Sequence, residues 1–362
     1  MDHPEWHAVP AAELAGWSER LLRSGASLFQ LPYWTEPLRQ LRLSPVHLVW
    51  RDRGTAIAWA SVLRFGLPGA YVGLVQRGPV SLVDGTPVPG RASMELVQWA
   101  ARHGIFCLRF THESERALEA VAAHPRARRL DPFPWYRDPR EALLVPQDGD
   151  DDAVLARFQP LARRKIRKGS AEGYHIDHSA APDALRDAWP LFQRLAARKG
   201  FSYRPLESFL HLLRLAAPVD GARVYTAWLG GVPVQAILVA RDGCVAHYIC
   251  GALDVEAIGH RESPSALLHW RAMRDFARLG AMDYDLGTRS GEVYQFKRIF
   301  HPCEVVFPAP VAVVTNRALF GAFAATALRI RGERWRRLKR VLSRMLGAMY
   351  PPRGAPPAPA AR

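Results

Sequence analysis

A spacing of glycines that occurs twice restricts the fold more than any other feature of this chain. Gly54 and Gly104 are 50 positions apart, and so are Gly230 and Gly280. Between the two glycines of each pair, strand-like segments are followed by a helical segment. One further strand comes directly after the second glycine. Internal self-similarity of this kind is typical of a duplicated supersecondary unit. The sequence therefore predicts an α/β protein built from two similar domains side by side, with a single large α/β domain as the alternative.

Hydrophobic periodicity and turn residues define the expected elements of each half. Both halves show strands separated by Gly-containing turns, then a helix that ends at a glycine, then a buried strand. In the second half we expect strands over 223–229, 234–241, 245–251 and 281–286, with a helix over 264–279. In the first half we expect helices over 11–23, 33–41 and 92–103, with strands over 46–50, 56–65, 71–82 and 105–110.

Length and composition agree with two domains. The chain has 362 residues, of which 49% are hydrophobic and 23% are charged, which is enough apolar sequence for two separate cores. We place a first domain at 1–145, a second domain with the reactive site at 146–315, and a basic C-terminal helix at 316–350 that can pack on the first domain. The range 351–362 is rich in Pro and Ala and is predicted to be a disordered tail.

The net charge of +15 indicates attraction to polyanions. RNA, nucleotide phosphates and anionic lipid are the partners that such a surface favours, although an arginine-rich composition produces the same charge without any of them. The range 329–344 concentrates this charge, with eight Lys and Arg residues against the single acid Glu333. Apolar residues alternate with these cations. The range can lie on an anionic membrane, follow tRNA or dock on the protein itself.

The cysteines and the N-terminus indicate a cytoplasmic protein. The four cysteines have no CxxC spacing, so we expect free thiols in a reducing compartment and no metal site. The range 1–5 has neither the basic nor the apolar region of a secretory signal, and the apolar run 318–328 is too short to span a bilayer. Peripheral contact with the inner face of the membrane is left open.

Lys297 is the strongest candidate for chemistry. It follows Phe296, close after a strand that ends near Asp285, and a desolvated ammonium stabilises the oxyanion that forms when an amine attacks an ester. Asp285 shares a strand face with Asp283, and we assign Asp285 to accept a proton from the amine or to orient it. Alternatively, Lys297 only pairs with Asp285 or Glu292. The chain has no GxSxG motif for a serine nucleophile.

A basic segment that begins at Pro160 is predicted to be a helix with one cationic face. The residues on that face are Arg163, Arg164, Arg167 and Lys168. Guanidinium groups bind phosphates through two parallel hydrogen bonds, so this face is a candidate for phosphate contact. A solvated helix face has the same charge pattern.

Two further segments are candidates for phosphate contact. Arg198 and Arg204 lie near a predicted helix end at Gly200, where they can clamp a phosphate while Tyr203 supplies an apolar wall. A capped helix end with cations in its last turn is the alternative. Ser263 precedes a proline and has the features of a helix N-cap, whose free amides suit the phosphate of a donor. An ordinary cap has the same signature.

Together these motifs resemble the FemAB/FemX family of peptidoglycan peptidyltransferases, which use aminoacyl-tRNA. The resemblance covers about residues 24–310, and its motifs are short. They are the basic run 163–168, the run 198–201 with Arg204, the runs 284–287 and 296–298, and the run 77–79 in the first half. The resemblance implies two tandem GNAT-like domains, which have the acyl-CoA N-acyltransferase fold, with mixed sheets and the acceptor in a cleft beside the second.

The resemblance also implies roles for individual residues. Phe296 and Lys297 are expected to contact the acylated end of the tRNA, with Lys297 as the oxyanion stabiliser and Arg298 beside them in the donor site. Arg198 and Arg204 are expected to bind phosphates of the acceptor. No cofactor is expected beyond the aminoacyl-tRNA that serves as co-substrate.

The function that the resemblance implies is an aminoacyltransferase. It would transfer an amino acid from aminoacyl-tRNA to an amine of a peptidoglycan precursor, a muropeptide linked to a nucleotide or a lipid. Related proteins use acyl-CoA, so an N-acyltransferase acting on a polysaccharide or small metabolite is the second hypothesis. The pyrophosphate loop Q/R-x-x-G-x-G/A of such proteins is not visible in 257–263, which favours aminoacyl-tRNA. A non-catalytic RNA- or membrane-binding protein is the third hypothesis.

Overall fold

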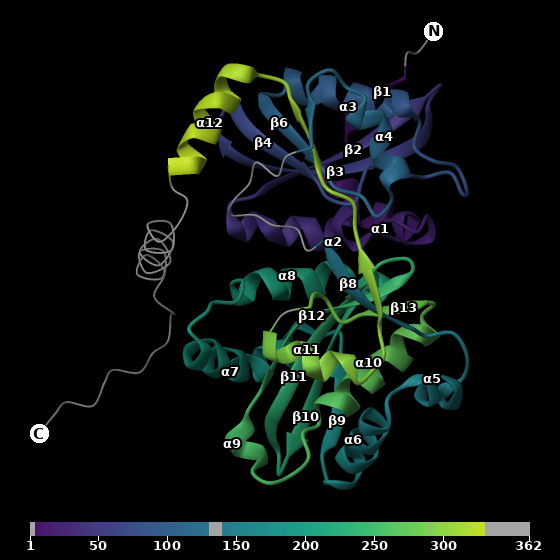
Figure 1. Ribbon diagram of the computed structural model, residues 1–362, viewed down its shortest axis with the longest axis vertical. Helices are drawn as coiled ribbons and strands as arrows, with labels where there is room; N and C mark the ends of the chain where they lie inside the picture. The colour runs from purple at the N-terminus through teal and green to yellow at the C-terminus, as the bar shows by residue number, and fades with distance from the viewer. Residues whose placement is uncertain (1–3, 130–139, 290, 330–362) are drawn as a thin grey trace, which may run out of the picture.

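Two α/β domains are stacked along the long axis of the molecule (Figure 1). The computed structural model describes residues 4–129, 140–289 and 291–329. Each domain contains one mixed sheet with helices packed against it, so the expected α/β class is confirmed. Helices α1 (Leu14–Arg23) and α2 (Pro32–Thr35) of the first domain lie between the two sheets and face the second domain (Figure 1).

The first sheet has eight strands, and β4 and β6 form its parallel pair among the described strands. In spatial order the strands are β1 (Glu5–Ala8), β2 (Ser44–Asp52), β3 (Thr55–Leu67), β4 (Ala70–Val75), β6 (Ile105–Phe110), β15 (Val311–Val314) and β7 (Ala127–Arg128), and β5 (Val80–Ser81) pairs with β3. The remaining helices of this domain are α3 (Gly90–Arg102), α4 (Glu115–Ala122) and α12 (Arg317–Arg329).

The second sheet has seven strands in the described part of the chain, and β12 and β13 form the parallel pair among them. In spatial order the strands are β14 (Cys303–Val306), β8 (Glu141–Pro146), β13 (Asp283–Asp285), β12 (Val245–Leu253), β11 (Val232–Arg241), β10 (Ala222–Leu229) and β9 (His175–Ser179). The helices are α5 (Asp151–Arg157), α6 (Pro160–Ala171), α7 (Pro182–Lys199), α8 (Leu206–Ala216), α9 (Val255–Ile258), α10 (Ser265–Arg278) and α11 (Gly291–Arg298).

The duplicated order of elements is present in both sheets. In each domain, antiparallel strands lead to a strand that pairs in parallel with the strand after the long helix, namely α3 or α10. The predicted strand over 71–82 forms two strands, β4 and β5, because the chain turns at Arg77, whose φ is 48°. The predicted helix over 33–41 divides into α2 and a 3₁₀ segment that contains Pro37, which cannot donate a backbone hydrogen bond.

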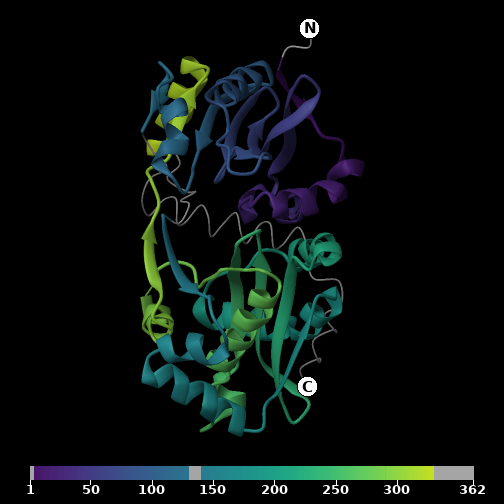
Figure 2. The ribbon, with the colours of Figure 1, turned by 90° about the vertical axis from the view of Figure 1, so that its right-hand side faces the viewer.

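From the strands that the structure describes, the chain crosses between the two sheets twice. Strand β8 inserts between β13 and β14 of the second sheet, and β15 inserts between β6 and β7 of the first. The crossings therefore lie near residues 140 and 310, whereas the sequence places the boundaries at 145 and 315. Figure 2 shows the returning segment as a yellow-green connection that runs beside β8 up to the first sheet.

A shared hydrophobic core joins the two domains. It contains Leu21 and Tyr33 from the first domain together with Phe192, Phe209 and Leu213 from the second, all of them buried. Hydrogen bonds also cross the interface, from the Tyr33 hydroxyl to the Arg241 carbonyl and from the Ser208 hydroxyl to the Pro37 carbonyl (3.0 Å). Each Å² of apolar surface buried in this shared core contributes about 25 cal/mol to the stability of the folded protein. The shared core therefore favours one arrangement of the two domains.

After β15 the chain stays on the first domain. Phe323 of α12 packs against Phe106, with ring centroids 5.5 Å apart, and Phe320 joins the same cluster. The basic range 329–344 lies almost wholly outside the described residues, so its predicted contacts stay predictions. Within the described part of the chain, no helix has both the length and the apolar character needed to cross a membrane.

Candidate active site

The parallel strands of the second domain separate soon after they meet. Strand β12 pairs with β13 at three positions, the last of which joins His247 and Asp285. After Asp285 the chain stays with β8, since the Leu286 amide donates to the Leu143 carbonyl (2.9 Å), and it no longer pairs with β12. Strand β12 continues to Leu253, and no described strand pairs with it on that side beyond His247. A crevice at the carboxyl ends of parallel strands is where α/β proteins commonly bind ligands.

A cavity of about 280 Å³ occupies this opening. Its walls come from β11 and β12, from the first turns of α10, from α11 and from the C-terminal part of α7. Most of the lining is apolar or aromatic, with a few polar groups, as is usual in small-molecule sites. The lining residues are Leu195, Gln235, Tyr248, Gly251, Ala252, Leu253, Ser265, His269, Leu286, Val293, Phe296 and Lys297.

Lys297 lines the cavity and is 6% exposed. Its Nζ donates to the Thr288 carbonyl at 2.8 Å. Burial lowers the pKa of Lys297 below the ordinary lysine value, and the negative charge of Asp285 opposes this effect. Gly287 has φ 79°, and a Cβ at this position would lie 3.7 Å from Nζ. The Gly287–Thr288 segment therefore holds the ammonium group at the cavity wall, and no other Lys, Arg, Asp or Glu occurs among those lining residues that the structure describes.

His269 lies beside Lys297 and stays uncharged. Its Nδ1 is 3.0 Å from the Tyr284 hydroxyl, and its ring centroid is 5.7 Å from that of Phe296. Burial, and then the charge of Lys297, lower the pKa of His269 to about 3. A neutral imidazole and an aromatic ring thus border the ammonium group, so its charge is little screened within the cavity.

The remaining polar groups of the cavity are hydroxyls and an amide. The Gln235 amide exchanges hydrogen bonds with the Ser265 hydroxyl at 2.8 and 3.0 Å. Tyr248 packs edge-on against His269, and burial raises the pKa of its phenol, which therefore remains a donor. The sequence interpretation missed these four residues, because the strand and helix patterns explain them as ordinary core positions. Their local signal is a polar residue at a position that the pattern of the strand or helix places in the core.

Asp285 lies behind the cavity wall and does not line it. Its Oδ2 is 3.2 Å from Nδ1 of His247, and its Oδ1 accepts a hydrogen bond from the Gly287 amide at 2.7 Å. Burial raises the pKa of Asp285, but the hydrogen bond and charge of His247 lower it more, so the group stays ionised. With both oxygens engaged, Asp285 is placed to hold the loop after β13, whereas the sequence interpretation assigned it to act on the amine.

Helix α10 begins at Ser265, two residues after the predicted cap. The Ser263 hydroxyl accepts a hydrogen bond from the Ser265 amide (3.3 Å) and lies 2.8 Å from the Ser265 hydroxyl. Ser265, not Ser263, lines the cavity. The start of this helix therefore lies at the cavity, and Ser265 faces it in place of Ser263.

Arg198 lies on a second groove next to the cavity. This groove, of about 200 Å³, shares Leu195 and Leu253 with the cavity, so the two spaces adjoin. Arg198 is exposed at the end of α7, and Arg194, one turn earlier, pairs with Asp254 at 3.0 Å. The groove therefore carries charges of both signs around an apolar floor.

Tyr203 and Arg204 serve contacts within the protein. The Tyr203 hydroxyl donates to the Gly251 carbonyl at 2.9 Å. The Arg204 guanidinium lies over the Trp34 ring of the first domain, 4.4 Å from its centroid. Neither residue lines the cavity or the second groove. Their predicted contact with a phosphate remains a prediction, and the geometry places both in packing contacts.

The basic face of α6 lies away from the cavity. Arg164, Arg167 and Lys168 are exposed, and Arg163 donates to the Ala156 carbonyl at 3.0 Å. The helix packs on α10 through Gly169 and does not line the cavity or the second groove. Arg298, the last residue of α11, is exposed and lies over the Tyr294 ring at 5.8 Å. The structure thus gathers Phe296 and Lys297 at the cavity and leaves the other predicted cations outside it.

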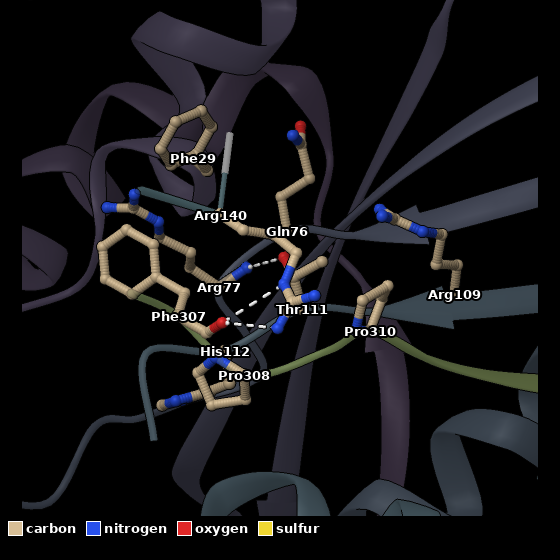
Figure 3. Close-up of a pocket in the computed structure, with 10 residues that line it drawn as sticks. All are labelled: Phe29, Gln76, Arg77, Arg109, Thr111, His112, Arg140, Phe307, Pro308 and Pro310. Carbon is tan, nitrogen blue, oxygen red and sulfur yellow. Dashed lines mark hydrogen bonds between the residues drawn. The ribbon is translucent and has the colours of Figure 1, made fainter. Parts of the chain in front are cut away.

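The first domain has a pocket at the equivalent position, and side chains fill it (Figure 3). Beyond the last paired residues, Val75 and Phe110, the Thr111 amide donates to the Val75 carbonyl (3.0 Å) and the Gly78 amide to the Thr111 carbonyl (3.2 Å). The strands therefore remain joined. Arg77 fits between the rings of Phe29 (4.8 Å) and Phe307 (4.3 Å), and the pocket retains about 20 Å³.

Comparison with known proteins identifies the fold. Residues 161–298 match the sequence family described as an acetyltransferase (GNAT) domain. The structure of FemX is 14% identical with a TM-score of 0.74, and the match covers 88% of this chain and 100% of that one. No curated protein matches the chain.

Two weaker structural matches come from other proteins. L-PGS from Bacillus licheniformis is 14% identical with a TM-score of 0.54, covering 90% of this chain and 98% of that one. The C-terminal domain of an Agrobacterium fabrum protein described as a lysylphosphatidylglycerol synthetase is 13% identical with a TM-score of 0.52, covering 88% and 96%. The second domain thus contains a match to a GNAT domain, and the chain as a whole has a fold similar to that of FemX, with two tandem GNAT-like domains.

Proposed function

We propose that this protein is an aminoacyltransferase that uses aminoacyl-tRNA and an amine of a peptidoglycan precursor. The observation that carries the proposal is the position of Lys297, whose buried ammonium group borders the cavity between the separating strands beside Phe296. The expected roles of these two residues in the donor site agree with that position. Asp285 is not needed as a base in this proposal, since its carboxylate is occupied by His247 and Gly287.

In the proposed reaction an amine nitrogen attacks the ester carbonyl of the donor. The C–N bond forms as the carbonyl oxygen becomes an oxyanion, which Lys297 stabilises at close range. The oxyanion then collapses to the amide carbonyl and the C–O bond breaks, so that the ribose oxygen of the tRNA leaves, takes up the proton that the amine loses and becomes a free hydroxyl. Because the ester is already activated, binding both reactants in one orientation supplies much of the remaining acceleration. The apolar walls of the cavity keep water from competing with the amine.

The charge of the protein supports an anionic donor. The net charge is +15, and the exposed cations Arg164, Arg167 and Lys168 extend from one face of α6. We assign this face to the tRNA backbone and Arg198, at the mouth of the adjoining groove, to a phosphate of the muropeptide precursor. One structural relative is described as a lysylphosphatidylglycerol synthetase, and the product in that description is an amino acid attached to a lipid. This description supports a lipid-linked acceptor and peripheral contact with the membrane.

An acyl-CoA-dependent N-acyltransferase is the second candidate. The observation that favours it is the match of residues 161–298 to an acetyltransferase domain. In that case the cavity would receive an acyl thioester, and Lys297 would stabilise the same oxyanion. The acceptor would then be an amine of a polysaccharide or small metabolite.

Parallel assays with the two donor classes test the proposal. Purified protein is incubated with charged tRNA or with acyl-CoA, together with a muropeptide nucleotide, and the acylated muropeptide, deacylated tRNA and free CoA are measured. We expect acceptor-dependent release of tRNA and no release of CoA. Release of CoA alone would establish the second candidate. Tight, salt-sensitive RNA or anionic-vesicle binding without transfer from either donor would establish the non-catalytic alternative.

A further inference from the structure

His247 is a buried histidine with a carboxylate on each ring nitrogen. Its Nε2 lies 2.9 Å from Oδ2 of Asp242, and its Nδ1 lies 3.2 Å from Oδ2 of Asp285. The exposed fractions of the three residues are 5%, 4% and 8%. A buried imidazole between two carboxylates is stable only as the imidazolium, which donates to both. Consistent with this, the hydrogen bonds and charges of the two carboxylates outweigh burial and raise the pKa of His247 to about 9.

On one side this cluster reaches the first domain. Oδ2 of Asp242 accepts a hydrogen bond from the Leu28 amide at 3.1 Å, although 214 positions separate the two residues. Oδ1 of Asp242 accepts from the amides of Cys244 (2.9 Å) and Val245 (2.7 Å). The ring of Phe29 packs edge-on against His247, with 6.5 Å between centroids. The segment before α2 is thus attached to the start of β12.

On the other side the cluster reaches the cavity. Oδ1 of Asp285 accepts from the Gly287 amide at 2.7 Å, and the next residue, Thr288, supplies the carbonyl that accepts from Nζ of Lys297 at 2.8 Å. Together with the covalent link between Gly287 and Thr288, these hydrogen bonds form one connected path from the first domain to Lys297. Each step is short, and the ionised groups along it are almost fully buried.

We propose that His247 is a positioning residue that fixes Lys297 at the cavity through Asp285 and the Gly287–Thr288 segment, and that it makes this position depend on the docking of the first domain at Leu28. What Lys297 does when so placed rests on the proposed function, whereas its placement does not. Loss of the imidazolium leaves Asp242 and Asp285 as buried like charges without a shared partner, which favours their separation. The loop held by Asp285 then moves, and Lys297 moves with it.

Chemical labelling of Lys297 tests this placement without reference to any reaction. The fraction of Lys297 methylated by formaldehyde and a hydride donor is followed by peptide mass spectrometry as a function of pH, in the wild type and in His247→Gln. We expect the midpoint for Lys297 to lie below the ordinary lysine value in the wild type, because the amine is buried. In His247→Gln it is expected to rise to the ordinary value as the ammonium group regains water.

A matched variant separates positioning from general damage. His47 of the first domain is also buried and bonded to a carboxylate, with Nε2 3.0 Å from Oε1 of Glu36. Neither His47 nor Glu36 lines the cavity, so His47→Gln breaks a comparable pair outside it and is expected to leave the Lys297 midpoint unchanged. If His247→Gln does not fold, Asp242→Asn keeps the shape of the cluster and is expected to shift the midpoint in the same direction.

The labelling experiment tests the positioning role of His247 separately from the proposed aminoacyl transfer. An unchanged Lys297 midpoint in both His247→Gln and Asp242→Asn would overturn the positioning role, whatever the protein catalyses. If transfer is observed, His247→Gln is expected to lower kcat about 100-fold with little change in the donor KM, because the loss falls on the transition state. If the wild type transfers nothing, the labelling result still decides the placement.

Discussion

The two domains share an order of elements but differ at the point where their parallel strands end. In the second domain β12 and β13 separate after three paired positions, and a cavity of about 280 Å³ opens between them. In the first domain β4 and β6 stay joined through Thr111 and Gly78, and Arg77 fills the remaining space between two aromatic rings. The fold alone therefore does not make a site. The backbone hydrogen bonds immediately after the strands decide which copy is open.

The largest expected effect tests whether the open copy carries the chemistry. Lys297→Met removes the cation of the cavity but keeps much of the side-chain volume, and we expect kcat for transfer to fall about 10³-fold, or roughly 4 kcal/mol of transition-state stabilisation. Arg23→Met removes an exposed cation of the first domain, 74% exposed at its side chain, and is the control. Equal turnover of the two variants would show that the cavity of the second domain does not carry the reaction.

A second test uses the pH dependence of folding. The pKa of His247 is raised to about 9 in the folded protein, against about 6.5 when unfolded. Its contribution to stability is therefore complete below about pH 6.5 and is lost as pH rises through about 9. We expect the free energy of unfolding, from urea titrations, to fall by up to about 3 kcal/mol across this window.

Two variants identify the source of that loss. His247→Gln is expected to be less stable at neutral pH and to show a flatter alkaline limb, because the titrating group is gone. His47→Gln should keep the steep limb of the wild type. An alkaline limb that is the same in all three proteins would mean that the ionised cluster between the domains does not contribute to stability.

Filling each pocket compares the two copies directly. Leu253→Trp projects a large ring into the opening of the second domain, and we expect the donor KM to rise about tenfold, or about 1.4 kcal/mol. Pro308→Trp places the same ring at the pocket of the first domain, which retains about 20 Å³, and should leave the donor KM unchanged. Steady-state kinetics with both substrates varied decide the matter, and an effect from Pro308→Trp alone would reverse the assignment of the open copy.

The smallest expected effect concerns the filled pocket itself. Arg77→Met removes the guanidinium from between Phe29 and Phe307 and breaks its 3.0 Å contact with Glu113. Such cation–π contacts contribute about 1 kcal/mol, so a slightly lower midpoint in urea and an unchanged transfer rate are expected. A stable variant with impaired transfer would show that the first-domain pocket takes part in the reaction.

Local sequence patterns were sufficient for much of the fold. The strand predicted over 105–110 has the same bounds as β6, and the helix predicted over 264–279 corresponds to α10, Ser265–Arg278. Lys297 was accessible to sequence reasoning because it lies beside Phe296 shortly after a buried strand. Periodicity predicts elements of this kind because their burial pattern is contained within one segment.

The remainder depends on contacts between distant segments. The bond from the Leu28 amide to Asp242 joins positions 214 apart, and that between His247 and Asp285 depends on the parallel register of β12 and β13. Tyr248 and His269 line the cavity only because the strands separate, which no local pattern specifies. The same holds for the start of α10, where the hydroxyl of Ser263 bonds to the Ser265 amide and the helix begins later than predicted.

The crossing strands have a consequence for how the protein is made. Strand β15 lies between β6 and β7, so the first sheet has a bare edge until Val314 has left the ribosome. An unpaired edge is a template for pairing with another nascent chain. The N-terminal domain, although translated first, is therefore the last to be completed, and a messenger truncated before this point would yield a product prone to aggregate rather than an independent folded domain.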